Sequence, residues 1–253
     1  MARIISIANQ KGGVGKTTTA VNLGASLAAA EKSILIVDLD PQANATSGLG
    51  LDSSTMVRSS YDVLIGDCEA KDAVVTTALD FLDVLPAHRD LAGAEVELVQ
   101  AEDRATRLKT AMRSVTDQYE FIIIDCPPSL GMLTLNALCA ADAVIVPLQC
   151  EYYALEGLAR LLETIGILRS DLNSNLVIDG IVLTMYDKRN NLSRQVEKEV
   201  RENFDGRVFK TIIPRNVKLS ESPSFGKPAL LYDVRSPGSQ QYLKFAQEYL
   251  AIQ

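Results

Sequence analysis

The sequence predicts an α/β fold in which a mostly parallel, twisted sheet carries helices on both faces. Strand-like and helical segments alternate along all 253 residues, which is the pattern of repeated strand–helix–strand units. Several strands are continuous apolar runs, as expected of strands buried on both faces of a sheet. No Gly/Ser-rich or Pro-rich linker and no internal repeat divides the chain, so we expect a single domain spanning residues 1–253.

Seven segments are predicted as strands. In chain order they are Arg3–Ala8, Ser33–Asp38, Phe81–Pro86, Phe121–Asp125, Ala143–Leu148, Val177–Thr184 and Val208–Ile213. Helical patterns lie between them at Lys16–Ala30, Asp103–Asp117, Tyr153–Ser170 and Ser193–Phe204. The tail, Tyr242–Gln253, is expected to form a helix that packs its apolar stripe on the domain. Because ligands of such sheets bind beyond the carboxyl ends of the strands, residues that follow each strand are the first candidates for a site.

A glycine-rich loop follows the first strand and runs from Asn9 to Thr18. Its glycines allow the backbone N–H groups to point inward at an anion, and the helix that begins near Lys16 adds its positive end. In this interpretation the loop residues contact a nucleotide's phosphates, Lys16 neutralises the β- and γ-phosphates, and the Thr17 hydroxyl ligates Mg²⁺. The expected contacts are Lys11, Gly12, Gly13, Val14, Gly15, Lys16, Thr17 and Thr18. A plain turn is the other interpretation, but the strand–loop–helix context favours phosphate binding.

The loop departs from the ordinary pattern G-x-x-x-x-G-K-[ST], because Gln10 stands where the first glycine should be and Lys11 adds a second lysine. Lys-Gly-Gly-Val-Gly-Lys-Thr resembles the deviant Walker A motif of the MinD/ParA class of P-loop ATPases. The resemblance implies a homodimer that encloses ATP, in which Lys11 reaches the partner's nucleotide. Without the motif, Lys11 would be read as a lysine that faces solvent.

Three aspartates end predicted strands. Asp38 and Asp40 lie on the same side of the chain at the end of a strand next to the loop, and Asp125 closes an apolar strand in the manner of a Walker B acid that holds Mg²⁺. A single such acid could equally cap a helix, but three together favour metal and water roles. The resemblance implies that Asp40 positions the attacking water and that Asp38 lies in the outer shell of the magnesium.

Further segments extend the resemblance to the chromosomal ParA/Soj partition ATPases over about residues 2 to 250. They are Asp40–Gly50, Leu91–Leu98, Asp125–Gly131, Gln149–Leu158 and Ile213–Pro228. The resemblance implies that Pro214 and Asn216 contact adenine, that an ATP-dependent dimer binds DNA without sequence preference through Arg189 and Lys218, and that a ParB-type centromere-binding partner stimulates hydrolysis and release. On the residues alone, Pro214–Asn216 could be a turn and the two cations could be solvated surface charges.

Three other kinds of protein in this class are alternatives to a partition ATPase. A MinD-like membrane-associated division-site ATPase would end in a basic amphipathic helix, whereas this tail holds one lysine and one glutamate. An iron–sulfur electron-transfer protein would need cysteine ligands, and Cys126 has no obvious second one. A ligase that phosphorylates a carboxylate lacks a distinct substrate segment. With no signal peptide, no membrane span and four scattered cysteines, we expect a cytoplasmic protein. The resemblance to the partition ATPases implies that it is associated with the nucleoid and not with a membrane.

Charge is distributed unevenly along the chain. The net charge of −7 alone argues against a nucleic-acid partner. Residues 1–183 hold 13 Lys and Arg against 24 Asp and Glu, whereas residues 184–253 hold 12 against 8. The C-terminal quarter is therefore basic, and two copies held together by ATP would double that basic surface.

Overall fold

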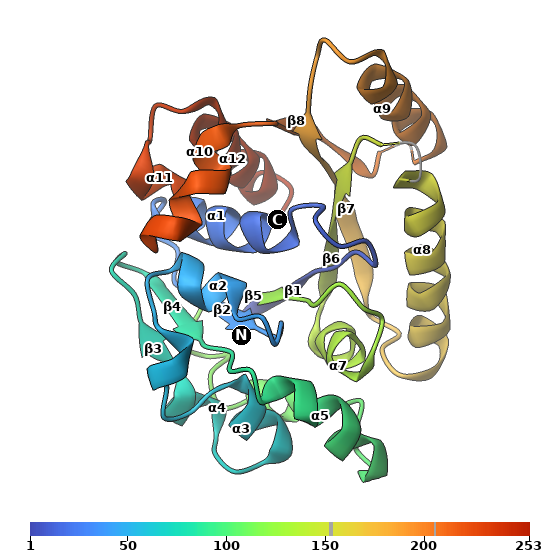
Figure 1. The fold of residues 1–253 in the computed structure, drawn as a ribbon. Helices are drawn as coiled ribbons and strands as arrows, with labels where there is room; N and C mark the ends of the chain where they lie inside the picture. The colour runs from blue at the N-terminus through green and yellow to red at the C-terminus, as the bar shows by residue number, and fades with distance from the viewer. Residues whose placement is uncertain (152–153, 205) are drawn as a thin grey trace.

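The computed structural model describes residues 1–151, 154–204 and 206–253. Its centre is a sheet of eight strands in the order β3-β4-β2-β5-β1-β6-β7-β8, in which only the pairing of β3 with β4 is antiparallel (Figure 1). Along the chain the strands are β1 Arg3–Ile7, β2 Ile34–Asp38, β3 Val75–Thr76, β4 Leu82–Leu85, β5 Phe121–Asp125, β6 Ala143–Gln149, β7 Val177–Tyr186 and β8 Val208–Pro214. The predicted fold class is confirmed.

Helices cover both faces of the sheet and divide its core in two (Figure 1). One face packs against α1 Lys16–Ala28, α2 Asn44–Gly48, α10 Val217–Glu221, α11 Ala229–Tyr232 and α12 Pro237–Leu250. The other packs against α3 Ser60–Ile65, α4 Ala70–Ala73, α5 Leu91–Glu97, α6 Arg107–Met112, α7 Met132–Ala140, α8 Ala154–Asp171 and α9 Asn191–Asn203. Three short 3₁₀ turns, η1 Ser53–Thr55, η2 Leu98–Gln100 and η3 Ser222–Phe225, complete the described elements. Because both faces are covered, β2 and β5 are buried at every residue, which explains their unbroken apolar runs.

The central strands of the sheet do not follow chain order. The strand that carries Asp38, β2, does not adjoin β1; β5 is inserted between them and pairs with both. The register nevertheless brings the strand ends level, since Asp125 lies opposite Asp38 on one side and Ile7 on the other. Asp125 therefore lies between Asp38 and the end of the strand that feeds the loop.

The predicted elements differ from the observed ones mainly in length. All seven predicted strands form with ends within two residues of those expected, while the two-residue β3 was missed. The helix expected over Asp103–Asp117 is confined to α6, with turns on either side. Tyr153, the expected start of a helix, lies outside the described residues. The tail does form α12 and buries Tyr242, Phe245 and Tyr249 against the sheet, as predicted.

None of the helices in the described part of the chain is both long enough and apolar enough to cross a membrane.

Candidate active site

The glycine loop joins β1 to α1 at the carboxyl edge of the sheet. Gly13 and Gly15 adopt φ of +74° and +88°, a conformation that other residues rarely take, so the loop's path depends on glycine at these two positions. The loop is also held from outside. The Asn9 side chain donates to Pro147 O at 2.7 Å, and the Thr184 hydroxyl donates to Val14 O at 2.8 Å. The structure therefore presents a preformed turn at a helix N-terminus, which is the geometry that binds phosphate.

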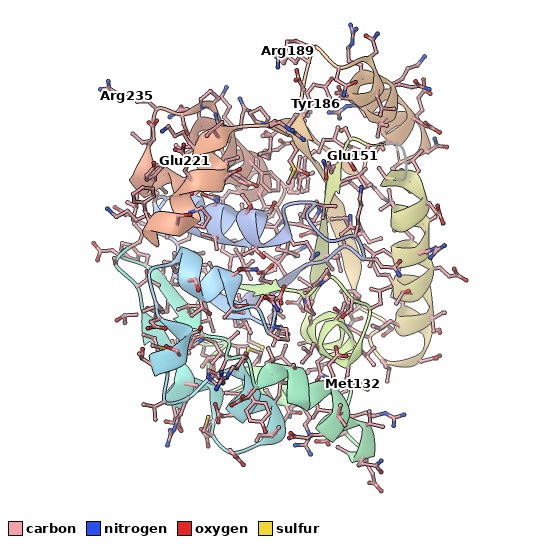
Figure 2. The ribbon with its side chains drawn as sticks, in the orientation of Figure 1. Met132, Glu151, Tyr186, Arg189, Glu221 and Arg235 are labelled. Carbon is pink, nitrogen blue, oxygen red and sulfur yellow. The ribbon has the colours of Figure 1, made fainter. Side chains whose placement is uncertain are left out.

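The two lysines of the loop point to different places. Lys16 is 6% exposed and its Nζ donates to Lys11 O at 3.1 Å, so the ammonium lies across the loop. Burial lowers the pKa of Lys16, while Asp125 and Asp40 nearby oppose that change. The Lys11 Nζ instead pairs with Glu151 Oε2 at 2.5 Å, and the other oxygen of Glu151 accepts from Gln149. Glu151 is labelled in Figure 2 beyond the end of β6. The Lys11 ammonium thus lies outside its own loop.

Asp125 ends β5 with a fully buried carboxyl group. Neither of its oxygens has a hydrogen-bond partner among the described residues. Burial raises the pKa of Asp125 well above its usual range, and the neighbouring Asp38 raises it further. The Thr17 hydroxyl faces this carboxyl group and opposes the rise, although it does not reach hydrogen-bond geometry. A buried, unpartnered acid beside a phosphate loop has the environment expected of a group that binds a cation.

Asp38, by contrast, has both of its carboxylate oxygens hydrogen-bonded. One oxygen accepts from the Thr46 N–H at 2.8 Å and the Thr46 hydroxyl at 2.7 Å, and the other accepts from the Asp40 N–H at 3.1 Å. Burial raises the pKa of Asp38 to about 6 in spite of these bonds. Asp40 is 8% exposed, and its carboxylate accepts from the Gln42 N–H at 2.9 Å.

The donors at this edge fit magnesium held jointly by protein and nucleotide. Among the residues described, no group of three His, Cys, Asp or Glu side chains could hold a metal ion without other ligands. Mg²⁺ is commonly bound by one or two carboxylates together with phosphate oxygens and waters. The unpartnered oxygens of Asp125 and the Thr17 hydroxyl suit that arrangement, and the occupied oxygens of Asp38 suit a position behind it.

A cavity of about 750 Å³ leads away from the loop. Gly15, Thr17 and Thr18 line one end, and the segment after β8 with Pro214 and Asn216 lines another part. The structure therefore brings together the predicted phosphate and adenine contacts, which lie about 200 residues apart in the sequence. The Asn216 carboxamide also accepts from the Lys218 N–H at 3.1 Å and so caps α10.

Several residues that line the cavity were not predicted. They are Val21, Asn22, Asn44, Ser47, Gly48, Met185 and Tyr242 among others. Asn44, Ser47 and Gly48 form α2, which lies in the predicted family segment Asp40–Gly50 but is too short to show helical periodicity. Next to it, Gly50 and Gly226 are in backbone contact, because a Cβ built on Gly226 would lie 2.7 Å from Gly50 Cα. That contact holds α2 against η3 at the rim of the cavity.

The two cations predicted to bind DNA lie on separate elements, and each is paired with an acid. Arg189 lies in the loop after β7 (Figure 2), has a 90% exposed side chain, and donates to both oxygens of Asp187 at 3.1 and 2.9 Å. Lys218, on α10, pairs with Glu221 at 2.9 Å and lies over the Tyr232 ring at 5.3 Å from its centroid. Both side chains are accessible to solvent, and each is paired with an acid of its own chain.

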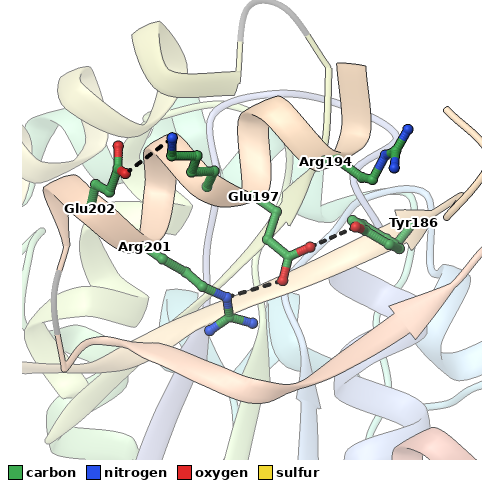
Figure 3. Close-up of a pocket in the computed structure, with 6 residues that line it drawn as sticks. Tyr186, Arg194, Glu197, Arg201 and Glu202 are labelled. Carbon is green, nitrogen blue, oxygen red and sulfur yellow. Dashed lines mark hydrogen bonds and ion pairs between the residues drawn. The ribbon is translucent and has the colours of Figure 1, made fainter. Parts of the chain in front are cut away.

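A second cavity, of about 690 Å³, lies beside α9 and shares none of its lining residues with the first. In Figure 3 the Tyr186 hydroxyl donates to Glu197 at 2.6 Å, and Arg201 pairs with the same carboxylate at 3.1 Å. Arg194 and Lys198 lie along the same side of α9. The polar groups of this cavity are largely paired with each other.

The cysteines behave as packing residues. All four are free, and Cys126 is 1% exposed with its thiol near Ile124 O at 3.9 Å. Burial raises the pKa of Cys126, Cys139 and Cys150, so these thiols stay protonated.

Comparisons with known proteins agree with this geometry. The AAA domain family matches residues 2–178. The chain is 55% identical to the sporulation initiation inhibitor protein Soj of Bacillus subtilis, over 99% of each chain. It is 54% identical to the chromosome partitioning protein ParA of Myxococcus xanthus, over 99% of this chain and 88% of that one.

Solved structures share the fold over the same length. Cobyrinic acid a,c-diamide synthase from Mycobacterium smegmatis, with bound ADP and magnesium, has a TM-score of 0.86 at 40% identity and covers 98% of this chain and 93% of its own. The cell division ATPase MinD of Pyrococcus furiosus has a TM-score of 0.82 at 29% identity over the whole of both chains. With more than half of its residues identical to Soj and ParA over nearly its whole length, the chain belongs to the ParA/Soj family of chromosome-partition ATPases.

Proposed function

We propose that this chain hydrolyses ATP to drive chromosome partition. ATP holds two copies together, the dimer binds DNA without sequence preference, and a ParB-type centromere-binding partner stimulates hydrolysis and release. The observation that carries the proposal is a cavity that joins the glycine loop, at Gly15, Thr17 and Thr18, to Pro214 and Asn216. The buried Lys16 and the unpartnered carboxylate of Asp125 lie beside Thr17 at the loop end of this cavity. The identity to Soj and ParA supports the partition role.

In this proposal the loop and the segment after β8 bind the two ends of ATP. The N–H groups of Gly12, Gly13, Val14, Gly15 and Thr18 and the ammonium of Lys16 hold the phosphates, while Pro214 and Asn216 contact adenine. Thr17 and Asp125 would hold Mg²⁺, with Asp38 behind them. Bound Mg²⁺ supplies charge neutralisation on the phosphates. The ADP and magnesium of the Mycobacterium smegmatis structure support this assignment.

Hydrolysis needs a positioned water more than a covalent catalyst. Asp40 is the residue assigned to that water, because its carboxylate is nearly buried at the edge where the phosphates would end and is fixed by the Gln42 N–H. Lys16 stabilises the charge that develops on the transferred phosphoryl group. Lys11 does so from the partner subunit, which requires it to leave Glu151.

The assignment of Asp40 is tested by Asp40→Ala. The variant keeps ATP binding, because the loop and the adenine segment are untouched, and it loses hydrolysis. ATP affinity by fluorescence titration and turnover by phosphate release measure the two properties separately. A variant that hydrolyses ATP at the wild-type rate would contradict the assignment.

DNA binding follows from the basic C-terminal quarter, in which Arg189 and Lys218 lie. Phosphate contacts from such cations give affinity and salt dependence without reading sequence. Two copies double the basic surface, so binding depends on the nucleotide that holds them together. The working location of such a protein is the nucleoid, in the cytoplasm.

A MinD-like, membrane-associated function is the alternative. The chain shares its fold with MinD, but its identity to MinD is 29%, against 55% with Soj. The comparisons therefore support the partition role more than the MinD-like one. The described C-terminal helix buries Tyr242, Phe245 and Tyr249 in the domain and leaves no apolar stripe for a lipid surface. Sedimentation with anionic liposomes and ATP separates the two readings, since a partition ATPase stays in the supernatant.

A further inference from the structure

The end of β2 is held by donors from α2 and α3 that meet at Asp38. Thr46, on α2, gives both its N–H and its hydroxyl to one carboxylate oxygen, at 2.8 and 2.7 Å. Ser60, on α3, donates its hydroxyl to the Asp38 carbonyl at 2.7 Å. The Ala87 N–H, which follows β4, donates to the Thr46 hydroxyl at 3.0 Å. Asp38, Thr46 and Ser60 are all completely buried.

The Thr46 hydroxyl is the link in this arrangement. It accepts from Ala87 and donates to Asp38, so its proton is directed at the carboxylate by the bond on its other side. The second oxygen of Asp38 accepts from the Asp40 N–H. A continuous chain of hydrogen bonds therefore runs from Ala87 through Thr46 and Asp38 to the backbone of Asp40.

The same short helix also lines the cavity. Asn44, Ser47 and Gly48 line the cavity, while Thr46 points the opposite way into the acids. The helix begins after Ala43, whose φ of +52° turns the chain sharply after the Asp40 loop. Because α2 both lines the cavity and bonds to Asp38, it is suited to fix the position of Asp38 relative to a nucleotide bound in the cavity.

We propose that Thr46 is a positioning residue for hydrolysis: its hydroxyl, fixed by the Ala87 N–H, orients Asp38 and through it holds the backbone that carries Asp40. The inference rests on the proposed ATPase function. Thr46 acts through Asp38 and does not line the cavity, so its loss slows turnover and leaves nucleotide binding intact.

The test compares Thr46→Val with Thr46→Ser in the full chain, with ATP as the probe. Valine keeps the size and the backbone N–H but removes the hydroxyl, which leaves the Ala87 N–H unpaired. Single-turnover hydrolysis is expected to fall about 10- to 100-fold, the range seen when a group that orients a metal-site ligand is removed. The Kd for ATP is expected to stay within about threefold of wild type, because Thr46 is not one of the residues that line the cavity. Serine restores the hydroxyl and the rate.

Thr77→Val is the matched control. The Thr77 hydroxyl donates to Leu82 O at 2.7 Å at the start of β4, the opposite edge of the sheet from the acids. Its loss removes a comparable bond, and the hydrolysis rate is expected to be unchanged. If Thr46→Val does not fold, Thr46→Cys replaces it with the same expectations, since a thiol is a weak donor of similar size.

The outcomes separate the inference from the function on which it rests. A wild-type chain that hydrolyses no ATP contradicts the proposed function. If the wild type hydrolyses ATP, the inference is overturned by a wild-type rate in Thr46→Val, by a serine variant as slow as the valine variant, or by a loss of ATP affinity that equals the loss of rate.

Discussion

Asp125→Asn is expected to stabilise the nucleotide-free protein while it abolishes magnesium-dependent nucleotide binding. The carboxylate is buried and has no hydrogen-bond partner among the described residues, and it lies beside a second buried acid, Asp38. Asparagine has nearly the same shape and carries no charge. The substitution therefore removes an uncompensated buried charge and its repulsion with Asp38 without breaking a protein hydrogen bond.

The size of the effect can be worked from the pKa of the neighbouring acid. Raising the Asp38 pKa from its usual 3.8 to about 6 corresponds to about 3 kcal/mol of folding free energy at neutral pH. Burial likewise raises the pKa of Asp125, so we take the cost of ionising its carboxyl group to be of the same order. For a chain of this size, where 1 kcal/mol shifts the melting temperature by about 2–4 °C, the variant is expected to melt roughly 5–10 °C higher.

The pH dependence of this effect has a defined sign. A carboxyl group whose folded pKa is raised stabilises the fold below its unfolded pKa, and that stability is lost as the pH rises through the folded pKa. The wild type is therefore expected to lose stability as the pH rises from about 4 through about 6, where Asp38 ionises, and the gain from Asp125→Asn is expected to be larger near pH 8 than near pH 5.

Thermal melts at these two pH values, with and without ATP and magnesium, make the measurement. Ligand at about 100 times its Kd stabilises the wild type by about 2.7 kcal/mol, and the variant is expected to gain much less. The nucleotide is thus expected to reduce or reverse the difference in melting temperature between the variant and the wild type. Two results would contradict the cost assigned to the buried charge. One is a variant that melts below the wild type near pH 8 without nucleotide, and the other is a gain in melting temperature that is the same at both pH values.

Three other predictions concern the cavity rim, the DNA surface and the thiols. Gly226→Ala is expected to destabilise the fold by about 1–3 kcal/mol and to weaken ATP binding, since its Cβ would lie 2.7 Å from Gly50 Cα at a φ of +60°; urea unfolding and ATP titration check this. Glu221→Gln is expected to raise ATP-dependent DNA affinity about two- to fivefold in a gel-shift assay, because Lys218 loses its intramolecular acid. In the native state a thiol reagent is expected to modify Cys68 first, because the other three cysteines are buried.

Each of these predictions has a control. A Cβ at Gly66, which has a φ of +92°, would meet only the Arg107 side chain, at 3.6 Å. Gly66→Ala should therefore destabilise the fold less than Gly226→Ala. An equal loss of stability would show that the close contact with Gly50 is not the cause. Glu163→Gln removes an exposed acid from α8 and should leave DNA affinity unchanged. A Glu221 variant no tighter than this control would show that the pair with Lys218 does not limit binding. Equal reactivity of all four thiols would contradict the burial.

Much of the fold could be predicted because its physical signals are local. Strands buried on both faces must be apolar at every position, so β2 and β5 are visible as unbroken runs. The loop is visible because Gly13 and Gly15 occupy backbone conformations that only glycine adopts freely. Acids that end such strands gather at one edge of a parallel sheet, which is why Asp38 and Asp125 could be grouped before their positions were known.

What could not be predicted depends on contacts between distant segments. The insertion of β5 between β1 and β2 is a matter of strand order, which local patterns do not encode. Lys11 pairs with Glu151, 140 residues away, and no spacing rule points to that partner. The five residues of α2 are too few to show a helical period, so neither its cavity-lining face nor the bond from Thr46 to Asp38 was foreseen.

In the proposed function, ATP makes this acidic chain a DNA-binding dimer. The most direct test of this proposal measures binding of the full chain to DNA of unrelated sequences, with ATP, with ADP and without nucleotide, over a series of salt concentrations. We expect the chain to bind DNA only when ATP is present, regardless of the DNA sequence, with an affinity that falls steeply as the salt concentration rises. Equal binding in all three nucleotide states, or binding in none of them, would contradict it.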